Sequence, residues 1–176
     1  MEHTIITESI IERFQNGQTD FRDLGTCRVI GQFTPTETIV IENMVHLGGL
    51  VFEEEVNFGY FDFRCEEIHF GEVVFKNDFT IGSQCKLKSV VISLESATLE
   101  AGFDFDCNEF DGSLHLGSVN IEGEIQSLGA LSKSTYIYAG DRPAVAWVLQ
   151  QATQSNIQYQ IADAPPWMQR PIVAQG

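Results

Sequence analysis

Apolar residues recur along the chain in short alternating pieces, and these pieces return at a step of about two dozen residues. The segment VHLGGLVFEEE at 45–55 returns as IHFGEVVFKND at 68–78, as ISLESATLEAG at 92–102 and as LHLGSVNIEG at 114–123. Repetition at such a period predicts stacked structural repeats, because one repeat cannot bury its apolar face alone and neighbouring repeats share a continuous core.

Four columns of apolar residues emerge when residues 33–55, 56–78, 79–102 and 103–123 are aligned. Each column lies in a piece such as VNF, FDF, IHF or FTI, whose alternation predicts a short strand with every second side chain in the core. The columns are Phe58, Ile81 and Phe105; Phe63, Leu87 and Phe110; Leu47, Phe70, Leu94 and Leu116; and Phe52, Phe75, Leu99 and Ile121.

Four short strands per repeat predict an all-β fold, a single-stranded four-sided β-helix (solenoid) with successive turns about 4.8 Å apart. Gly48, Gly71 and Gly117 share one position, with Glu95 as the exception, and a corner with positive φ would select glycine there. The alternative is an antiparallel β-sandwich, whose short strands also alternate but need no common register.

The ends of an open solenoid expose core and strand edges, so short helical caps are expected at both ends. At the front, Ser9 to Glu12 has capping-box spacing and Gly17 is a helix stop, which predicts a helical cap over 1–19. This helix would present Ile10, Ile11 and Phe14 to the first repeat.

The remainder of the chain is expected to form coils over 20–128 and a cap of strand and helix over 129–162. That cap would contain strands at 135–138 and 156–162 and a helix beginning near Pro143. Residues 163–176, which include the Pro-Pro-Trp sequence, are predicted to be an irregular tail.

The segment IIERFQNGQTDFRDL at 10–24 is similar to the N-terminal segment of pentapeptide-repeat proteins. Asp23-Leu24, Asp62-Phe63 and Asp104-Phe105 resemble the acidic-then-Leu/Phe pair at the centre of each pentapeptide. The resemblance implies a right-handed coil of square section. The repeat here is longer than the family's, and Phe61 and Phe103 stand where the family has a small residue. Leucine-rich repeats of the bacterial surface type are a second resemblance, carried by the period and by STYIYAGDRPAVAWVLQQ.

Charge narrows the classes of partner. The net charge is −15, and residues 33–124 hold 18 Asp and Glu against four Lys and Arg, which leaves −14 in the repeats. Such a surface repels nucleic acid and anionic membranes. The four cysteines form no CxxC pair, and the N-terminus shows no basic segment before an apolar run, so we expect reduced thiols in a cytoplasmic protein.

The chain contains no P-loop, GxSxG or HExxH sequence, so we expect no enzyme and no cofactor. The predicted function is binding of a protein partner with a basic surface. Its sharpest form is DNA mimicry towards a DNA-binding enzyme, and members of the family that the chain resembles do this with DNA gyrase. The alternatives are a structural, self-assembling scaffold, with a homodimer through the C-terminal cap, and a carbohydrate-active or metal-dependent β-helix enzyme.

Two groups of residues are candidate sites. His46 and His69 should lie one strand spacing apart, in a column that continues through Ser93 to His115, and they are the candidates for binding a metal ion. The acidic residues expected to face a protein partner are Glu53, Glu54, Glu55, Asp62, Glu66, Glu67, Asp104, Asp106, Glu109 and Asp111.

Overall fold

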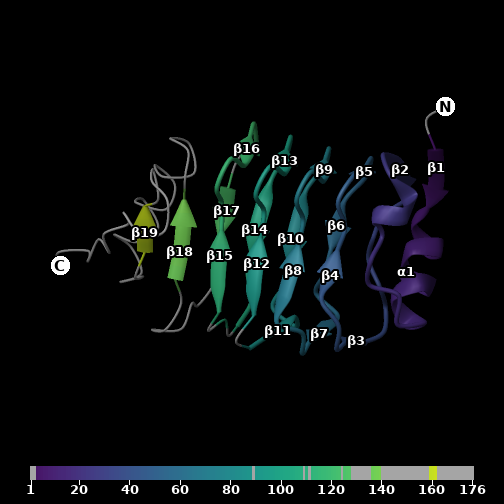
Figure 1. Cartoon of the computed structure of the whole chain (residues 1–176), viewed down its shortest axis with the longest axis horizontal. Helices are drawn as coiled ribbons and strands as arrows, with labels where there is room; N and C mark the ends of the chain where they lie inside the picture. The colour runs from purple at the N-terminus through teal and green to yellow at the C-terminus, as the bar shows by residue number, and fades with distance from the viewer. Residues whose placement is uncertain are drawn as a thin grey trace.

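The computed structural model describes residues 3–88, 90–108, 110 and 112–123, together with the backbone of strands 125–127, 136–139 and 159–161. Within these residues the chain is an all-β protein with little helix, and its strands lie side by side along the long axis of the molecule (Figure 1). Every strand pairing among them is parallel. The antiparallel sandwich is therefore wrong.

The strands form four parallel sheets, called first to fourth in the order in which the chain passes through them from residue 50 to residue 69. The first contains β1 (His3–Ile6), β2 (Cys27–Ile30), β5 (Leu50–Phe52), β9 (Val74–Phe75), β13 (Thr98–Leu99) and β16 (Asn120–Ile121). The second contains β6 (Val56–Asn57), β10 (Phe79–Ile81), β14 (Phe103–Phe105) and β17 (Ile125–Ser127). The third contains β3 (Ile39–Ile41), β7 (Phe61–Phe63) and β11 (Lys86–Leu87). The fourth contains β4 (Val45–His46), β8 (Glu67–His69), β12 (Val91–Ser93), β15 (Ser113–His115), β18 (Tyr136–Ala139) and β19 (Tyr159–Ile161).

Neighbouring strands of a sheet come from successive repeats. In the fourth sheet His46 lies beside His69, His69 beside Ser93, and Ser93 beside His115. The predicted apolar columns keep the same register, as the pairing of Phe52 with Phe75 in the first sheet illustrates. The repeat recognised in the sequence is therefore the repeat of the structure.

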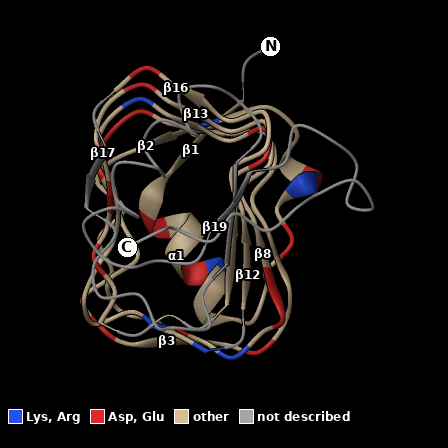
Figure 2. Ribbon diagram, turned by 90° about the vertical axis from the view of Figure 1, so that its left-hand side faces the viewer, with Lys and Arg blue, Asp and Glu red and all other residues tan. Residues whose placement is uncertain are grey.

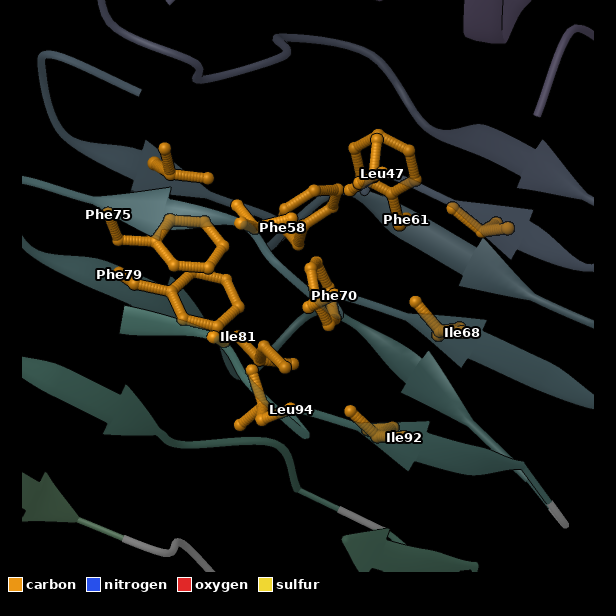
Figure 3. Close-up of a cluster of buried hydrophobic side chains, with 14 of the residues drawn as sticks. Leu47, Phe58, Phe61, Ile68, Phe70, Phe75, Phe79, Ile81, Ile92 and Leu94 are labelled. Carbon is orange, nitrogen blue, oxygen red and sulfur yellow. The ribbon is translucent and has the colours of Figure 1, made fainter. Parts of the chain in front are cut away.

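The core lies between the four sheets and is dominated by phenylalanine. All thirteen Phe side chains of the chain are buried. The rings of Phe75 and Phe79 stack with centroids 4.0 Å apart (Figure 3), and Phe79 also stacks on Phe103 at 5.3 Å. Burial of each such side chain contributes roughly 1.5–3 kcal/mol, which explains how strands of two or three residues can hold together.

The corner between the fourth and the first sheet is a four-residue turn in each repeat. The backbone N–H of Leu50 donates to the carbonyl of Leu47, and the equivalent bond joins Val73 to Phe70. The third residue of the turn has positive φ, as expected for a type II turn. The residues concerned are Gly49, Glu72, Ser96 and Ser118.

The prediction that Gly48, Gly71 and Gly117 supply positive φ is therefore wrong by one position. Space is short at Gly48, where a Cβ atom would lie 3.2 Å from the carbonyl oxygen of Gly71. A Cβ atom on Gly71 would lie 3.4 Å from the carbonyl oxygen of Glu95, which is an ordinary contact. Close packing between successive corners therefore favours glycine at Gly48, and the column also accommodates Glu95.

The N-terminal end begins with β1 and continues into α1 (Thr7–Gln15), which buries Ile10 and Phe14. The helix begins at Thr7 with Ile6 as its N-cap, so the capping box proposed at Ser9 is wrong. Gly17, with φ of 77°, ends the helix in a Schellman motif: its N–H donates to Phe14 O, and the N–H of Gln18 donates to Arg13 O.

After α1, the chain makes a short 3-10 helix (Arg22–Leu24) before β2. At the other end, β18 and β19 extend the fourth sheet near the predicted strands, at residues 136–139 and 159–161. The predicted helix near Pro143, the tail and the C-terminal dimer surface lie outside the described residues.

Candidate functional site

Acidic residues gather at the corner between the first and the second sheet. The N–H groups of Glu53, Lys76, Glu100 and Glu122 donate to carbonyls of the strand one repeat earlier, so these four residues form one column. Acidic segments are seen at this corner beside β13 and β16 (Figure 2). We call this surface the acidic ridge; its residues are Glu53, Glu54, Glu55, Asp78, Glu100 and Glu122.

Glu53 is the neutralised member of the acidic ridge. Its carboxylate accepts hydrogen bonds from Arg28 Nε at 2.7 Å and from Lys76 Nζ at 3.1 Å. These bonds lower the pKa of Glu53 below its ordinary value, with that to Arg28 as the main cause. Glu54, Glu55, Glu100 and Glu122 form no ion pair with the described residues, so negative charge at this corner exceeds positive charge.

Two ridge carboxylates also bind the backbone of a neighbouring repeat. Glu54 Oε1 accepts from the Gly31 N–H at 3.1 Å, and Asp78 Oδ1 accepts from the Gly102 N–H at 2.9 Å. These bonds satisfy amide groups where the chain turns out of the sheet. They fix the position of the carboxylates and hold successive corners together, so the acids have a structural role as well.

The acidic residues singled out from the sequence do not share one surface. Asp62 lies on β7 and binds Arg64 Nη2 at 2.8 Å, whereas Glu67 lies on β8 and contacts His69 Nε2 at 3.1 Å. Glu66 is exposed next to Glu67. Of the predicted acidic residues, Glu53, Glu54 and Glu55 belong to the acidic ridge; Glu109 and Asp111 lie outside the described residues.

Asp104 and Asp106 lie on and just after β14 of the second sheet. Asp104 Oδ1 is buried and has no hydrogen-bond partner among the described residues. Burial raises the pKa of Asp104, and the nearby Asp106 adds to the effect. A carboxyl group in this position takes up a proton more readily than an exposed one.

Sequence reasoning missed Asp78, Glu100 and Glu122 of the acidic ridge. The signal was present: Glu53, Glu100 and Glu122 each follow directly after an apolar column that ends a strand of the first sheet. The residue after an inward position points outward, so the column placed these side chains on the surface at one corner.

A cleft of about 580 Å³ lies at the corner between the fourth and the first sheet, and we call it the histidine cleft. Its walls include His46 and His69, whose rings are parallel with centroids 4.6 Å apart. Arg22 also lines it and donates to Asp20, which lowers the pKa of Asp20 well below its usual range.

A second hollow of about 650 Å³ beside the third sheet is lined by residues that include Tyr60, Asp62 and Lys86.

The histidine pair does not by itself make a metal centre. No group of three or more His, Cys, Asp or Glu side chains suited to a metal ion exists among the described residues. His69 contacts Glu67, and His115 exchanges a hydrogen bond with Ser113 Oγ at 3.2 Å. Two imidazoles leave two positions of a tetrahedral zinc site without a protein ligand.

In comparisons with known proteins, no protein-family model, no curated protein and no solved structure matches the chain. The pentapeptide-repeat and leucine-rich-repeat resemblances therefore stay expectations. In the described residues, no helix is long and apolar enough to cross a membrane.

Proposed function

We propose that the chain is a four-sided, right-handed β-solenoid that binds a protein partner with a basic surface through the acidic ridge. The observation that carries the proposal is the ridge itself, where Glu54, Glu55, Glu100 and Glu122, from three of four successive repeats, form no ion pair with the described residues. Glu100 and Glu122 occupy equivalent positions of neighbouring repeats, one strand spacing of about 4.8 Å apart, and Glu54 and Glu55 lie two repeats earlier.

The solenoid part of the proposal is supported by the order of the sheets. The chain visits the first, second, third and fourth sheets in turn and then returns to the first, as β5, β6, β7, β8 and β9 illustrate. Seen in Figure 2, this order runs anticlockwise while the chain advances towards the viewer, as in a right-handed coil.

DNA mimicry is the sharpest form of the proposal. Carboxylates placed at multiples of about 4.8 Å along one corner resemble a phosphate strand, which carries one charge per about 3.4 Å of helix axis. A DNA-binding enzyme such as gyrase would then meet the ridge as it meets a nucleic acid backbone. Lys76 interrupts the row and is bound to Glu53, and the two repeats that follow contribute Glu100 and Glu122.

The test is a pull-down from nuclease-treated bacterial lysate, followed by mass spectrometry, at low salt and at about 0.5 M salt. The purified chain is compared with a ridge variant carrying Glu54→Gln, Glu55→Gln, Glu100→Gln and Glu122→Gln. Glutamine keeps the acceptor that Glu54 offers to Gly31 and removes only charge. A matched control carries Glu12→Gln, Glu37→Gln, Glu42→Gln and Glu66→Gln, the same change in charge at exposed residues away from the ridge.

We expect a DNA-processing enzyme or another basic protein that is held at low salt, released at high salt, lost with the ridge variant and kept with the control. Equal loss with both variants would show that net charge alone is responsible and would overturn the ridge as the site. Recovery of the chain alone, resistant to salt, would replace the proposal with the scaffold alternative.

A further inference from the structure

The strand β1 ends the first sheet at the N-terminal end of the molecule (Figure 1). Among the described residues it pairs with β2 alone, so its second edge carries no strand. Edge strands of this kind present backbone N–H and C=O groups that can pair with another chain. Most soluble proteins cover or charge such an edge, which makes an uncovered one informative.

The groups that face the free edge follow from the hydrogen bonds of β2. The Cys27 N–H donates to Gly49 O, and Val29 O accepts from the Glu53 N–H, so residues 27 and 29 bond towards β5. Residues 28 and 30 then bond towards β1, because backbone groups alternate along a strand.

The register pairs Thr4 with Arg28 and Ile6 with Ile30. In a parallel pair, residues directly beside each other point their backbone groups in the same direction, so Thr4 and Ile6 point away from β2. Ile6 is the N-cap of α1, and its carbonyl accepts the first bond of the helix. The free edge therefore offers three groups: the N–H and C=O of Thr4 and the N–H of Ile6.

Two exposed isoleucines flank this edge. Ile6 is 56% exposed and Ile30 is 41% exposed, and the two are direct neighbours in the register of β1 and β2. Glu53 occupies the next position along the same column, since Val29 pairs with Phe52. The isoleucines thus continue the column of the acidic ridge and give it an apolar end.

Charge decides between the possible occupants. Glu8 is exposed in the first turn of α1, directly after β1, and the Glu54 carboxylate reaches the Gly31 N–H at the end of β2, the strand beside β1, while Arg28 on β2 is bound to Glu53. A second copy of the chain would bring a net charge of −15 and a second set of these acids. An extended segment with basic side chains would instead find carboxylates beside a free strand edge.

We propose that β1 accepts an extended, lysine- or arginine-bearing segment of a partner protein as an added strand, with an apolar side chain of that segment against Ile6 and Ile30. This inference rests on the proposed function and specifies where and how the basic partner is held. Backbone bonds would supply affinity, and the isoleucine pair and nearby acids would select the segment.

The probe is a synthetic acetylated and amidated peptide in which lysine alternates with valine or threonine, titrated at low salt. Amide hydrogen exchange of the chain is followed residue by residue. Thr4→Pro removes one outward N–H without touching the bonds to β2, and proline is tolerated on the free side of an edge strand. Thr4→Val is the matched control because it keeps the N–H, and unfolding midpoints verify that both variants fold.

We expect binding that slows exchange of the Thr4 and Ile6 amides, is unchanged in Thr4→Val, and is weakened about three- to tenfold in Thr4→Pro, the effect of one hydrogen bond. The double variant Ile6→Thr/Ile30→Thr should also weaken it, and a peptide with glutamate in place of lysine should not bind.

Failure of this inference is distinguishable from failure of the proposed function. Strand addition is wrong if the peptide binds Thr4→Pro as tightly as the unaltered chain and leaves the Thr4 and Ile6 amides of the unaltered chain unprotected. If the ridge variant then also fails to bind the peptide, binding through the ridge stands. Absence of binding to the unaltered chain overturns strand addition, while the pull-down decides the ridge independently. A concentration-dependent dimer that Thr4→Pro abolishes would overturn the basic occupant in favour of a second copy.

Discussion

His46 and His69 stand one repeat apart on the fourth sheet with their imidazole rings stacked, at 4.6 Å between centroids and 4° between planes. This geometry follows directly from the register, because residues at equivalent positions of successive repeats lie one strand spacing apart. Two stacked rings at this distance repel each other when both carry a proton. The pair is therefore compatible with the fold chiefly when at least one ring is neutral.

Stability should fall as the pH is lowered from 7.5 to 5.5. The pKa of His46 lies below its ordinary value of 6.5, mainly because of burial and then because of Arg22 and His69, and burial also lowers the pKa of His115. The unfolded chain binds more protons in this window, so the stabilisation is fully present above pH 6.5 and is lost as the pH falls. Urea unfolding at several pH values measures it, with a slope of at most about 1.4 kcal/mol per pH unit for each histidine.

The substitution His46→Gln should make this pH dependence shallower, because the residue that resists protonation is gone. His3→Gln, at an exposed position on β1 of the first sheet, is the control for loss of a histidine away from the pair. The interpretation is wrong if the unaltered chain and His46→Gln lose stability in parallel between pH 7.5 and 5.5.

Glycine substitutions in the turns between the fourth and the first sheet should stabilise the chain. Glu72 and Ser96 have φ of 61° and 62°, in the left-handed region that costs an ordinary residue roughly 1–2 kcal/mol. Glycine removes that cost but gains conformational entropy in the unfolded chain, so Glu72→Gly or Ser96→Gly should raise the free energy of unfolding by about 0.5–1 kcal/mol. Urea titration at pH 7 measures the change.

Gly49 provides the opposite test at the equivalent position. Its φ is 85°, and a Cβ atom would lie 2.7 Å from the carbonyl oxygen of Gly25, so Gly49→Ala should destabilise the chain by more than 1 kcal/mol.

The matched control for Ser96→Gly is Ser83→Gly, which lies in a turn without positive φ and should be neutral or mildly destabilising. Stabilisation by Ser83→Gly as large as by Ser96→Gly would contradict the argument from φ.

The repeat was predictable because the buried residues of each repeat are apolar and recur in the sequence at the period of the structure. Phe52, Phe75 and Leu99 had to be apolar in register, since each packs beside the next in the first sheet. The histidine stack was predictable for the same reason, as its residues occupy equivalent positions. Features that follow from strand alternation and from the repeat period can be predicted from a single sequence.

The features missed are those that depend on local geometry. Positive φ is found at Gly49 and Glu72, one residue after the glycine column, because the turn type places it at the third turn residue whatever the side chain. The pairing of Glu53 with Arg28 and Lys76 joins three repeats and needs the side-chain positions to be known. The acidic residues therefore looked equivalent in the sequence although some are neutralised and others are not.

Phe79 should be one of the most sensitive core positions. It is fully buried and stacks on Phe75 at 4.0 Å and Phe103 at 5.3 Å, so it joins three successive repeats. Phe79→Ala should lower the free energy of unfolding by about 3–5 kcal/mol, the cost of a buried cavity of that size. Tyr60→Ala, which truncates a 37% exposed ring, should cost far less. Similar losses for the two variants in urea titrations would contradict the packing described for Phe79.

The four cysteines should be unreactive in the native protein. Cys27, Cys65, Cys85 and Cys107 are all free and buried, and burial raises the pKa of each, for Cys107 to about 12. The reactive thiolate is therefore almost absent at neutral pH. A thiol-specific chromogenic reagent at pH 8 should label none of them in minutes and all of them in denaturant.

The same burial predicts a difference between two substitutions at Cys107, which is fully buried. Cys107→Ala removes a small apolar group, whereas Cys107→Ser places a hydroxyl in the core and should cost about 1–3 kcal/mol more unless it finds a partner. Urea titrations of the two variants at pH 7 measure the difference. Rapid labelling of one thiol in the native state, or equal stability of the two variants, would mean that this part of the core admits water, and the burial argument would be wrong.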